Sequence, residues 1–190
     1  MSSPLDPFLP IFDAREHFEV RVQAPAALTF ATAAAFDLQS LWPIRAIFRL
    51  RELLLRSRNP RPPSLGILTE LPAFGWGQLA LEPDHLFVAG AFCQPWLADV
   101  HFTPLDAQTF PLFREPGYVK IAWTLEVDPV TEHTCVLRTE TRAAATDSQT
   151  QVRFKAYWRW ARLGILPIRW FLLPAIRRAA EARTRRASMY

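Results

Sequence analysis

Tyr118, Glu140 and Arg142 are the residues of this chain whose types and spacing could support acid–base chemistry. Glu140 and Arg142 alternate along a predicted strand over residues 134–145, and Tyr118 opens another over 118–127. A carboxylate, a guanidinium and a phenol that reach one ligand could transfer a proton or orient a polar headgroup. These three residues are therefore the catalytic candidates, if the chain is an enzyme.

The same residues also fit a purely structural interpretation. Arg138 shares a strand face with Glu140 and Arg142, and Lys120 and Glu126 occupy even positions of the neighbouring strand. Opposite charges that face each other across two strands stabilise a sheet by about 0.2–1 kcal/mol per pair. The alternative to a catalytic cluster is a solvent-exposed face of the sheet on which these charges pair.

No spacing in the chain predicts a metal or cofactor site. The histidines form no HxxH or HExxH pattern and stand in separate segments, at positions 17, 85, 101 and 133. Zinc or non-haem iron needs ligands that converge, and Cys93 and Cys135 lack a metal-ligand spacing too. The chain also lacks a GxGxxG or GxxxxGK(S/T) loop for a nucleotide phosphate. We expect no metal and no cofactor.

Composition restricts the class of protein. The chain has 190 residues, 50% hydrophobic and 21% charged, which suits one domain with a full core and excludes a disordered chain. The net charge of +4 is uneven, because residues 153–190 hold nine Arg, one Lys and one acid. Such a basic end suits an anionic membrane surface or a helix with a solvated face. We expect no nucleic-acid partner, and a homodimer stays open.

The chain carries no pattern typical of secretion or membrane insertion. Residues 1–12 contain three prolines and no Lys or Arg, unlike a signal peptide. The most apolar stretch, 163–176, is short and holds Arg169. We expect a cytoplasmic protein that forms one domain over 1–190, with its core over about 17–182 and loose ends at 1–14 and 184–190.

Hydrophobic periodicity predicts an α+β order of elements. A strand over 17–22 places Phe18, Val20 and Val22 on one face and precedes two helices, over 26–36 and 44–56. The strands that follow cover residues 75–81, 85–92, 100–103, 118–127 and 134–145. The strand over 118–127 alternates strictly, so its odd positions form one packed face.

A long amphipathic helix is predicted at the end of the chain, with Asp147 as its N-cap. Its apolar stripe recurs at spacings of three and four, through Phe154, Trp158, Ala161, Ile165, Ile168, Leu172, Ile176 and Ala179. Pro167 and Pro174 lack an N–H and would kink or divide the helix. Leu163, Leu166 and Trp170 stand off this stripe beside arginines, which leaves open a contact with an anionic membrane, another subunit or the first helices.

Five segments follow one another along the chain: Arg45–Leu53 (RAIFRLREL), Phe110–Trp123 (FPLFREPGYVKIAW), Thr139–Arg142 (TETR), Phe154–Arg159 (FKAYWR) and Ile168–Glu181 (IRWFLLPAIRRAAE). In this order they resemble the START-like (SRPBCC, Bet v 1-like) helix-grip superfamily, and within it an uncharacterised bacterial branch. The resemblance implies a curved antiparallel sheet wrapped around a long C-terminal α-helix, with two shorter helices after the first strand. It also implies a deep, mostly apolar cavity between sheet and helix, without singling out a reaction.

The side chains expected to line that cavity come from the inward faces of the sheet and the last helix. They are Trp76, Trp123, Thr139, Thr141, Phe154, Trp158 and Ile165. If the odd face of 118–127 turns inward, the hydroxyls of Thr139 and Thr141 lie in an apolar pocket, where they can orient a ligand. Trp96 could line the same pocket, although a large aromatic side chain fills a core equally well.

These observations favour non-catalytic binding or transport of a small hydrophobic or lipid-like ligand. An enzyme alternative is a cyclase or aromatase of the polyketide type, with Tyr118, Glu140 or Arg142 handling the proton. A third alternative is peripheral binding to an anionic membrane through the basic C-terminal helix.

Overall fold

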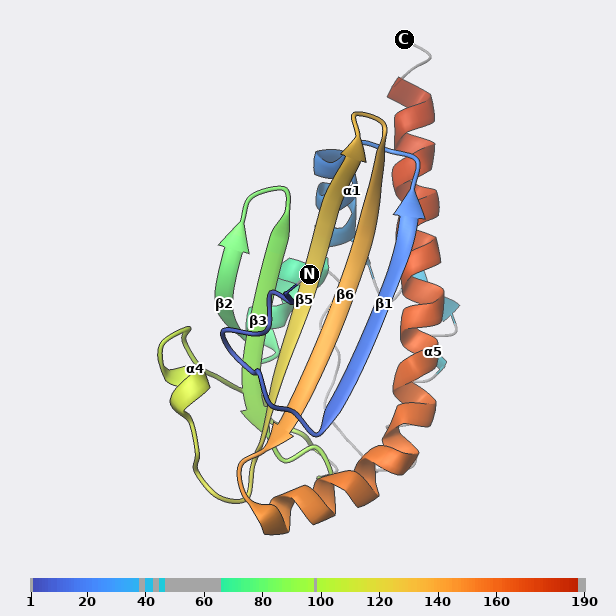
Figure 1. Ribbon diagram of the computed structural model, residues 1–190. Coiled ribbons are helices and arrows are strands. Elements are labelled where there is room, and N and C mark those ends of the chain that lie inside the picture. The colour runs from blue at the N-terminus through green and yellow to red at the C-terminus, as the bar shows by residue number, and fades with distance from the viewer. Residues whose placement is uncertain (1, 38–39, 43–44, 47–65, 98, 188–190) are drawn as a thin grey trace.

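The structure is a computed structural model that describes residues 2–37, 40–42, 45–46, 66–97 and 99–187, with the backbone alone at 164–167 and 169. Most of the helix predicted over 44–56, and of the Arg45–Leu53 segment, lies outside the described residues. The predicted α+β helix-grip architecture is confirmed: an antiparallel sheet lies against a long C-terminal helix (Figure 1).

The sheet has six strands in the order β1-β6-β5-β3-β2, with β4 paired to β3. Its strands are β1 (Ala14–Val22), β2 (Gly77–Glu82), β3 (Leu86–Cys93), β4 (Thr103–Pro104), β5 (Val119–Thr131) and β6 (Thr134–Ala145). β5 and β6 form a hairpin of 13 and 12 residues at the centre. The prediction for β6 is confirmed to the residue, whereas the strand predicted over 100–103 is reduced to the two residues of β4.

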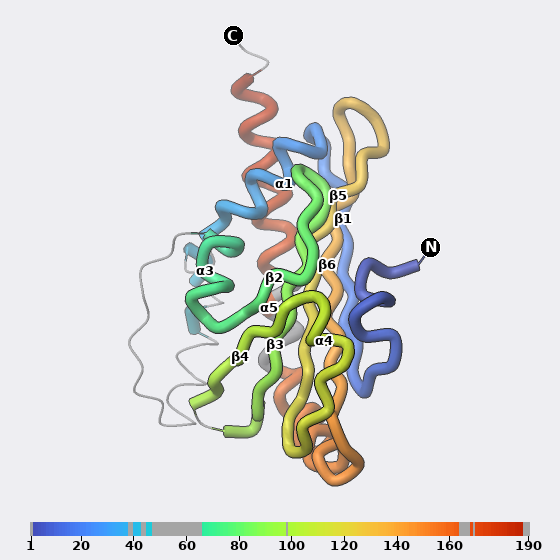
Figure 2. Tube along the Cα trace, turned by 90° about the vertical axis from the view of Figure 1, so that its left-hand side faces the viewer, coloured from blue at the N-terminus to red at the C-terminus, as the bar shows by residue number. Residues whose placement is uncertain are grey.

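Helices and loops cover both faces of the sheet. The inner face packs against α1 (Ala26–Ala34), α3 (Ile67–Ala73) and α5 (Ser148–Ala187), and the outer face against the N-terminal residues and α4 (Thr109–Leu112) (Figures 1 and 2). The sequence pattern does not predict α3 or α4. α5 stays one continuous helix of 40 residues, so Pro167 and Pro174 do not divide it, although it bends along its course (Figure 1).

Asp147 is the N-cap that the sequence predicts for α5. Its carboxylate accepts a hydrogen bond from the Thr150 amide at 2.8 Å and another from the Gly117 amide at 2.8 Å. The first bond satisfies a free N–H of the opening turn of α5, and the second ties that turn to the loop before β5. Asp147 therefore sets where α5 leaves the sheet.

The inner face holds the larger core cluster. Val127 of β5 and Leu137 of β6 pack there with Ile176 of α5 and Phe30 of α1, and all four are buried. A helix stripe and the odd face of a strand each bury their apolar side chains only against another element. The predicted assignment of these two faces to the core is confirmed.

The outer face is buried as well, by residues expected to be loose. Leu5 is 0% exposed and Leu9 is 3% exposed, and both pack with Val88 of β3 and Phe110 of α4. Gly90 of β3 makes room for this layer, because a Cβ there would lie 2.8 Å from the Phe110 ring. The expectation of a loose segment over 1–14 is wrong for residues 2–13, because apolar side chains anchor them to the sheet.

Leu5→Ala is expected to lower the free energy of unfolding by about 2–5 kcal/mol, because it leaves a cavity in the outer-face core. Ile11→Ala is the matched control in the same segment, since Ile11 is 84% exposed. It should change stability by about 0.5 kcal/mol or less. Urea unfolding followed by circular dichroism measures both variants, and equal losses would contradict the anchoring role.

Asp147→Ala is expected to lower the melting temperature at neutral pH, while Asp147→Asn, which keeps a capping oxygen, lowers it less. Hydrogen bonds from the Thr150 side chain and the Thr150 and Gly117 amides lower the pKa of Asp147 to about 2. The stabilisation is therefore complete above the ordinary value of 3.8 and is lost as the pH falls through about 2. Thermal unfolding between neutral and acid pH should show the three curves converging at the acid end.

Candidate functional site

Solvent reaches the middle of the inner face but not its two ends. In β5, Val119, Leu125 and Val127 are buried, whereas Ile121 and Trp123, which lie between Val119 and Leu125, are only half-buried. In β6, Ala143 is buried and the neighbouring Thr141 is half-buried. A solid core would bury the middle of a central strand most completely. The half-buried middle shows that the described part of the layer facing it does not close over it.

The same profile recurs on β1 and on α5. Glu16, Phe18 and Val20 are half-buried between the buried Ala14 and Val22 at the two ends of β1. On α5, Phe154 and Ile176 are buried, and half-buried residues of the predicted apolar stripe lie between them. We call these central residues the inner band: Glu16, Phe18, Val20, Ile121, Trp123 and Thr141 on the sheet, and Trp158, Ala161, Ile168 and Leu172 on α5.

The inner band contains three of the residues predicted to line a cavity. Trp123 and Thr141 are directly opposite each other on β5 and β6, and Trp158 comes from the facing stripe of α5. Thr139 lies on the same sheet face but is 3% exposed. The ring of Phe154 is buried beside Trp158, with 5.7 Å between the ring centroids.

The other two predicted residues are less central. Trp76 precedes β2, stacks on Phe102 with 5.0 Å between the ring centroids, and packs at the margin of the inner-face core. Gly75 permits that approach, because it has a φ of +83° and a Cβ there would meet the Phe102 carbonyl. The side chain of Ile165 lies outside the described residues.

Glu16 is a residue of the inner band that the sequence interpretation missed. The predicted strand began at His17, whereas β1 begins at Ala14, and the register sets Glu16 opposite Thr141. Phe18 and Val20 alternate on one face of the strand, and continuing that alternation two residues toward the N-terminus reaches Glu16. Among the described residues no side chain forms an ion pair with Glu16, so its carboxylate can accept hydrogen bonds from a ligand.

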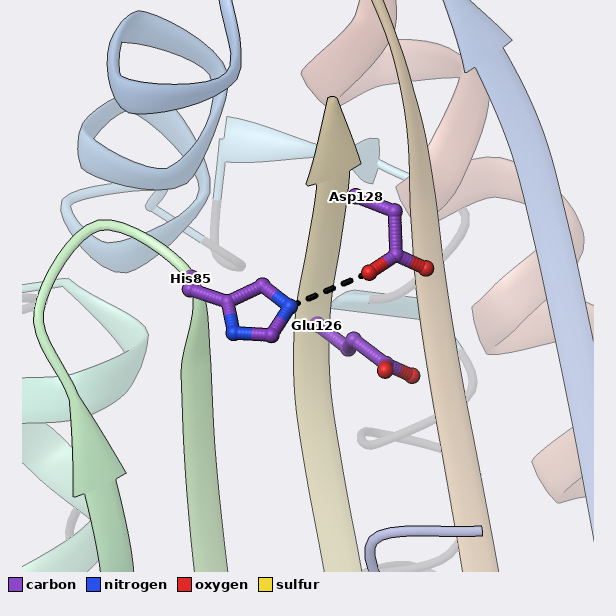
Figure 3. A group of neighbouring side chains, drawn as sticks. All are labelled: His85, Glu126 and Asp128. Atoms are coloured by element: carbon purple, nitrogen blue, oxygen red, sulfur yellow. Dashed lines mark hydrogen bonds and ion pairs between the residues drawn. The ribbon is translucent and has the colours of Figure 1, made fainter. Parts of the chain in front are cut away.

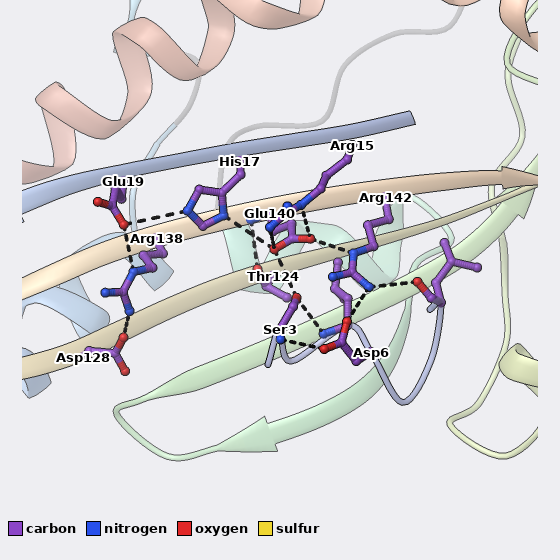
Figure 4. Close-up of polar contacts among 12 residues, drawn as sticks. Ser3, Asp6, Arg15, His17, Glu19, Thr124, Asp128, Arg138, Glu140 and Arg142 are labelled. Atoms are coloured by element: carbon purple, nitrogen blue, oxygen red, sulfur yellow. Dashed lines mark hydrogen bonds and ion pairs between the residues drawn. The ribbon is translucent and has the colours of Figure 1, made fainter. Parts of the chain in front are cut away.

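Glu140 and Arg142 lie on the outer face, away from the inner band. Each is 4% exposed, and the Arg142 Nε donates to Glu140 Oε1 at 2.7 Å (Figure 4). The N-terminal segment closes over the pair: Ser3 Oγ donates to Glu140 at 3.1 Å, and Arg142 donates to Asp6 at 2.8 Å. Every acceptor of Glu140 is thus already in use within the protein.

The electrostatics of this buried cluster favour charged side chains. Burial by itself would raise the pKa of Glu140, but hydrogen bonds from Arg15 and Arg142 outweigh it and lower the pKa below its usual range. The Arg15 Nε lies 2.9 Å from Glu140 Oε1. Glu140 stays ionised at neutral pH and cannot act there as a general acid.

This placement corrects two expectations from the sequence. Glu140 and Arg142 occupy even positions of β6, which the register turns outward, so they cannot act on a ligand at the inner band. They are not solvent-exposed either, because residues 2–13 cover them. Nor does Lys120 pair with them: its Nζ donates to the carbonyls of Phe110 at 3.1 Å and Pro111 at 3.2 Å.

Tyr118 and Lys120 share this outer location. The Tyr118 ring packs edge-on against Phe92, with 5.0 Å between the centroids, and takes part in an aromatic cluster with Phe113. Burial beneath α4, together with the charge of Arg114, lowers the pKa of Lys120 to about 8. Tyr118 is therefore removed from the inner band as a proton donor.

Farther along the outer face, ion pairs cross the sheet from β1 to β5. Arg138 of β6 contacts both Glu19 and Asp128 (Figure 4). Asp128 in turn lies 3.0 Å from His85 Nε2, and with Glu126 these side chains point toward one another (Figure 3). His85, Glu126 and Asp128 are of metal-binding types. Sequence spacing cannot reveal this grouping, because His85 precedes β3 whereas Glu126 and Asp128 belong to β5. Arg138 already supplies the positive charge beside Asp128.

An open groove of about 680 Å³ lies at the start of α5. Trp96 lines it, and the Arg153 guanidinium lies 4.6 Å from the centroid of the Trp96 ring. The carboxylate of Asp147 also lines the groove and occupies the helix N-terminus that an anion would otherwise use. Trp96 also packs against the small core cluster around Phe154 that Ile121 and Trp158 of the inner band contact, so it lies between the groove and the band.

The chain is similar in structure to several proteins whose structures have been solved. No protein-family model matches the chain, and no curated protein matches it in sequence. A point mutant of norcoclaurine synthase from Thalictrum flavum aligns at 15% identity and a TM-score of 0.45, covering 90% of this chain and 96% of that one. A conserved protein from Geobacillus kaustophilus aligns at 10% identity and a TM-score of 0.36, covering 87% and 97%. Because the identities and TM-scores are this low, the fold is assigned from the strand order and helix positions of the chain itself.

Within the described ranges, no helix is both long enough and apolar enough to cross a bilayer.

Glu140→Gln is expected to lower the free energy of unfolding by roughly 3–5 kcal/mol at neutral pH, because Arg142 keeps a buried charge and loses one of its two carboxylate partners. Glu19→Gln is the matched control, since that side chain is 58% exposed and should cost about 1 kcal/mol or less. The pKa of Glu140 is lowered, so its stabilisation is complete above the ordinary value of 4.5 and is lost as the pH falls below it. Chemical unfolding at neutral and acid pH tests this, and a loss that does not shrink in acid would refute the ionised assignment.

Proposed function

We propose that this chain binds a small hydrophobic or lipid-like ligand between the inner face of the sheet and α5, without catalysing a reaction. The inner band carries the proposal. Its residues are apolar apart from Glu16 and Thr141, and they stay half-buried between two buried ends. Apolar surface that the protein leaves accessible within its own core is surface that a ligand can cover.

Desolvation provides the driving force. Removing apolar area from water contributes about 25 cal/mol per Å², so a ligand that buries a few hundred Å² gains several kcal/mol before the cost of association. Trp123 and Trp158 offer large apolar surfaces from opposite sides of the band. Glu16 would orient the ligand by accepting a hydrogen bond from a hydroxyl or amine at one end.

The resemblance of five sequence segments to the START-like superfamily supports a binding function, because the cavity it implies falls where the inner band lies. The cyclase alternative needs a proton-transferring group at that cavity. Its three named candidates, Tyr118, Glu140 and Arg142, are instead held on the outer face by aromatic packing and ion pairs. The cyclase alternative would have to use Glu16, the carboxylate of the inner band, whereas binding needs only the apolar surface that the band exposes. Binding therefore has the better support of the two.

Thr141→Trp is expected to weaken binding of a fluorescent fatty acid at least roughly tenfold, or about 1.4 kcal/mol, because an indole opposite Trp123 fills the band. Arg21→Trp is the matched control: it adds the same side chain at an exposed position of β1. Fluorescence titration measures both. Native mass spectrometry of the purified wild-type protein should also detect a co-purifying apolar molecule.

Two results would count against the proposal. One is an unmodified mass for the purified protein together with no saturable binding of the fatty acid probe. The other is saturable binding that Thr141→Trp leaves unchanged, which would place the ligand elsewhere on the molecule.

A further inference from the structure

The side of α5 that faces away from the sheet exposes large apolar side chains. Trp160 is 72% exposed, Leu163 65%, Trp170 61% and Phe171 44%. At about 100° per residue, these four positions fall within about 100° of one another around the helix. We call them the outer α5 stripe. They follow one side of the helix over about 17 Å at 1.5 Å per residue.

This stripe does not belong to the core. The inward positions Phe154, Leu173 and Ile176 of the same helix are at most 5% exposed, so burial separates the two sides of α5 clearly. Single exposed apolar residues are normal on a protein surface, whereas a row of two Trp, a Phe and a Leu is not. A surface of this kind indicates a partner that covers it.

The charges around the stripe indicate the chemistry of that partner. Arg159, Arg162, Arg177 and Arg178 are exposed on the same helix. Across α5 there are nine Arg and one Lys against one acid, Glu181, which pairs with Arg177 at 3.1 Å. Tryptophan beside arginine suits the headgroup layer of an anionic bilayer, where the ring lies between apolar and aqueous surroundings.

We propose that the outer α5 stripe docks on the surface of an anionic lipid bilayer. A second copy of the chain suits the stripe less well, because two such faces would bring arginines against arginines with little acid between them. The helix lies along the surface and does not insert across it. This docking is independent of the proposed ligand: it uses the outward side of α5, and the inner band uses the inward side.

Vesicle flotation of the full chain tests the docking. Wild-type protein should float with vesicles of phosphatidylcholine and phosphatidylglycerol and stay behind with phosphatidylcholine alone. Arg159→Gln combined with Arg178→Gln should weaken binding roughly twenty-five-fold, taking about fivefold for each arginine near the surface. Trp160→Gln combined with Trp170→Gln should weaken it as well, through loss of buried apolar area.

Two controls test whether any loss of an exposed apolar side chain or an exposed arginine weakens flotation, wherever it lies on the protein. Ile11→Gln removes an apolar side chain that is 84% exposed, from the N-terminal segment on the other face of the sheet. Arg21→Gln removes an exposed arginine from β1. Both should float like the wild type, and circular dichroism should show all variants folded.

Three results would overturn the docking: no flotation of the wild type, flotation that does not need phosphatidylglycerol, or tryptophan variants that float like the wild type. A dimer in sedimentation equilibrium that Trp160→Gln with Trp170→Gln dissolves, in a protein that does not float, would assign the stripe to a second copy. The fatty acid titration uses no vesicles, so a protein that fails to float can still bind the fatty acid at the inner band. The two proposals can therefore fail separately.

Discussion

The pairing of β5 with β6 is the interaction on which the rest of the structure depends. The two strands form a long antiparallel hairpin at the centre of the sheet, and side chains opposite each other share a face. This register sends Trp123 and Thr141 to the inner face and Ala122 and Arg142 to the outer face. A slip by one residue would exchange the apolar and the charged sets, so the hairpin decides which chemistry each face can have.

Both faces of this sheet are covered, and by different means. Among the described residues, the inner face is covered by α1, α3 and α5, and the outer face by short α4 and the N-terminal segment. The segment combines two leucines with polar groups that satisfy Glu140 and Arg142. A buried ion pair contributes little net stability by itself, but its removal from water requires partners on every side. The N-terminal residues are therefore part of the fold and not an appendage to it.

The start of α5, its inward side and its outward side each have a different environment. Its start is held by Asp147, its inward side meets the sheet, and its outward side carries aromatic residues toward solvent. Several positions of its inward stripe remain half-buried between the buried Phe154 and Ile176. The helix thus closes the two ends of the inner face and leaves the middle accessible.

The sequence alone determined the elements with strong local patterns. β6, the faces of β1 and β5, and the capped start of α5 follow from side-chain alternation, helical spacing and N-cap chemistry, which act between near neighbours. It also selected Trp123, Trp158 and Thr141 for the inner band, because an inward face can be read from periodicity. Only the tertiary structure shows that Glu140 and Arg142 lie buried beneath residues more than 130 positions away in the sequence. The local sequence around Leu5 and Asp6 does not indicate which strand they contact. Only the structure gathers His85 with Glu126 and Asp128, because such contacts depend on strand order and register, which local spacing does not encode.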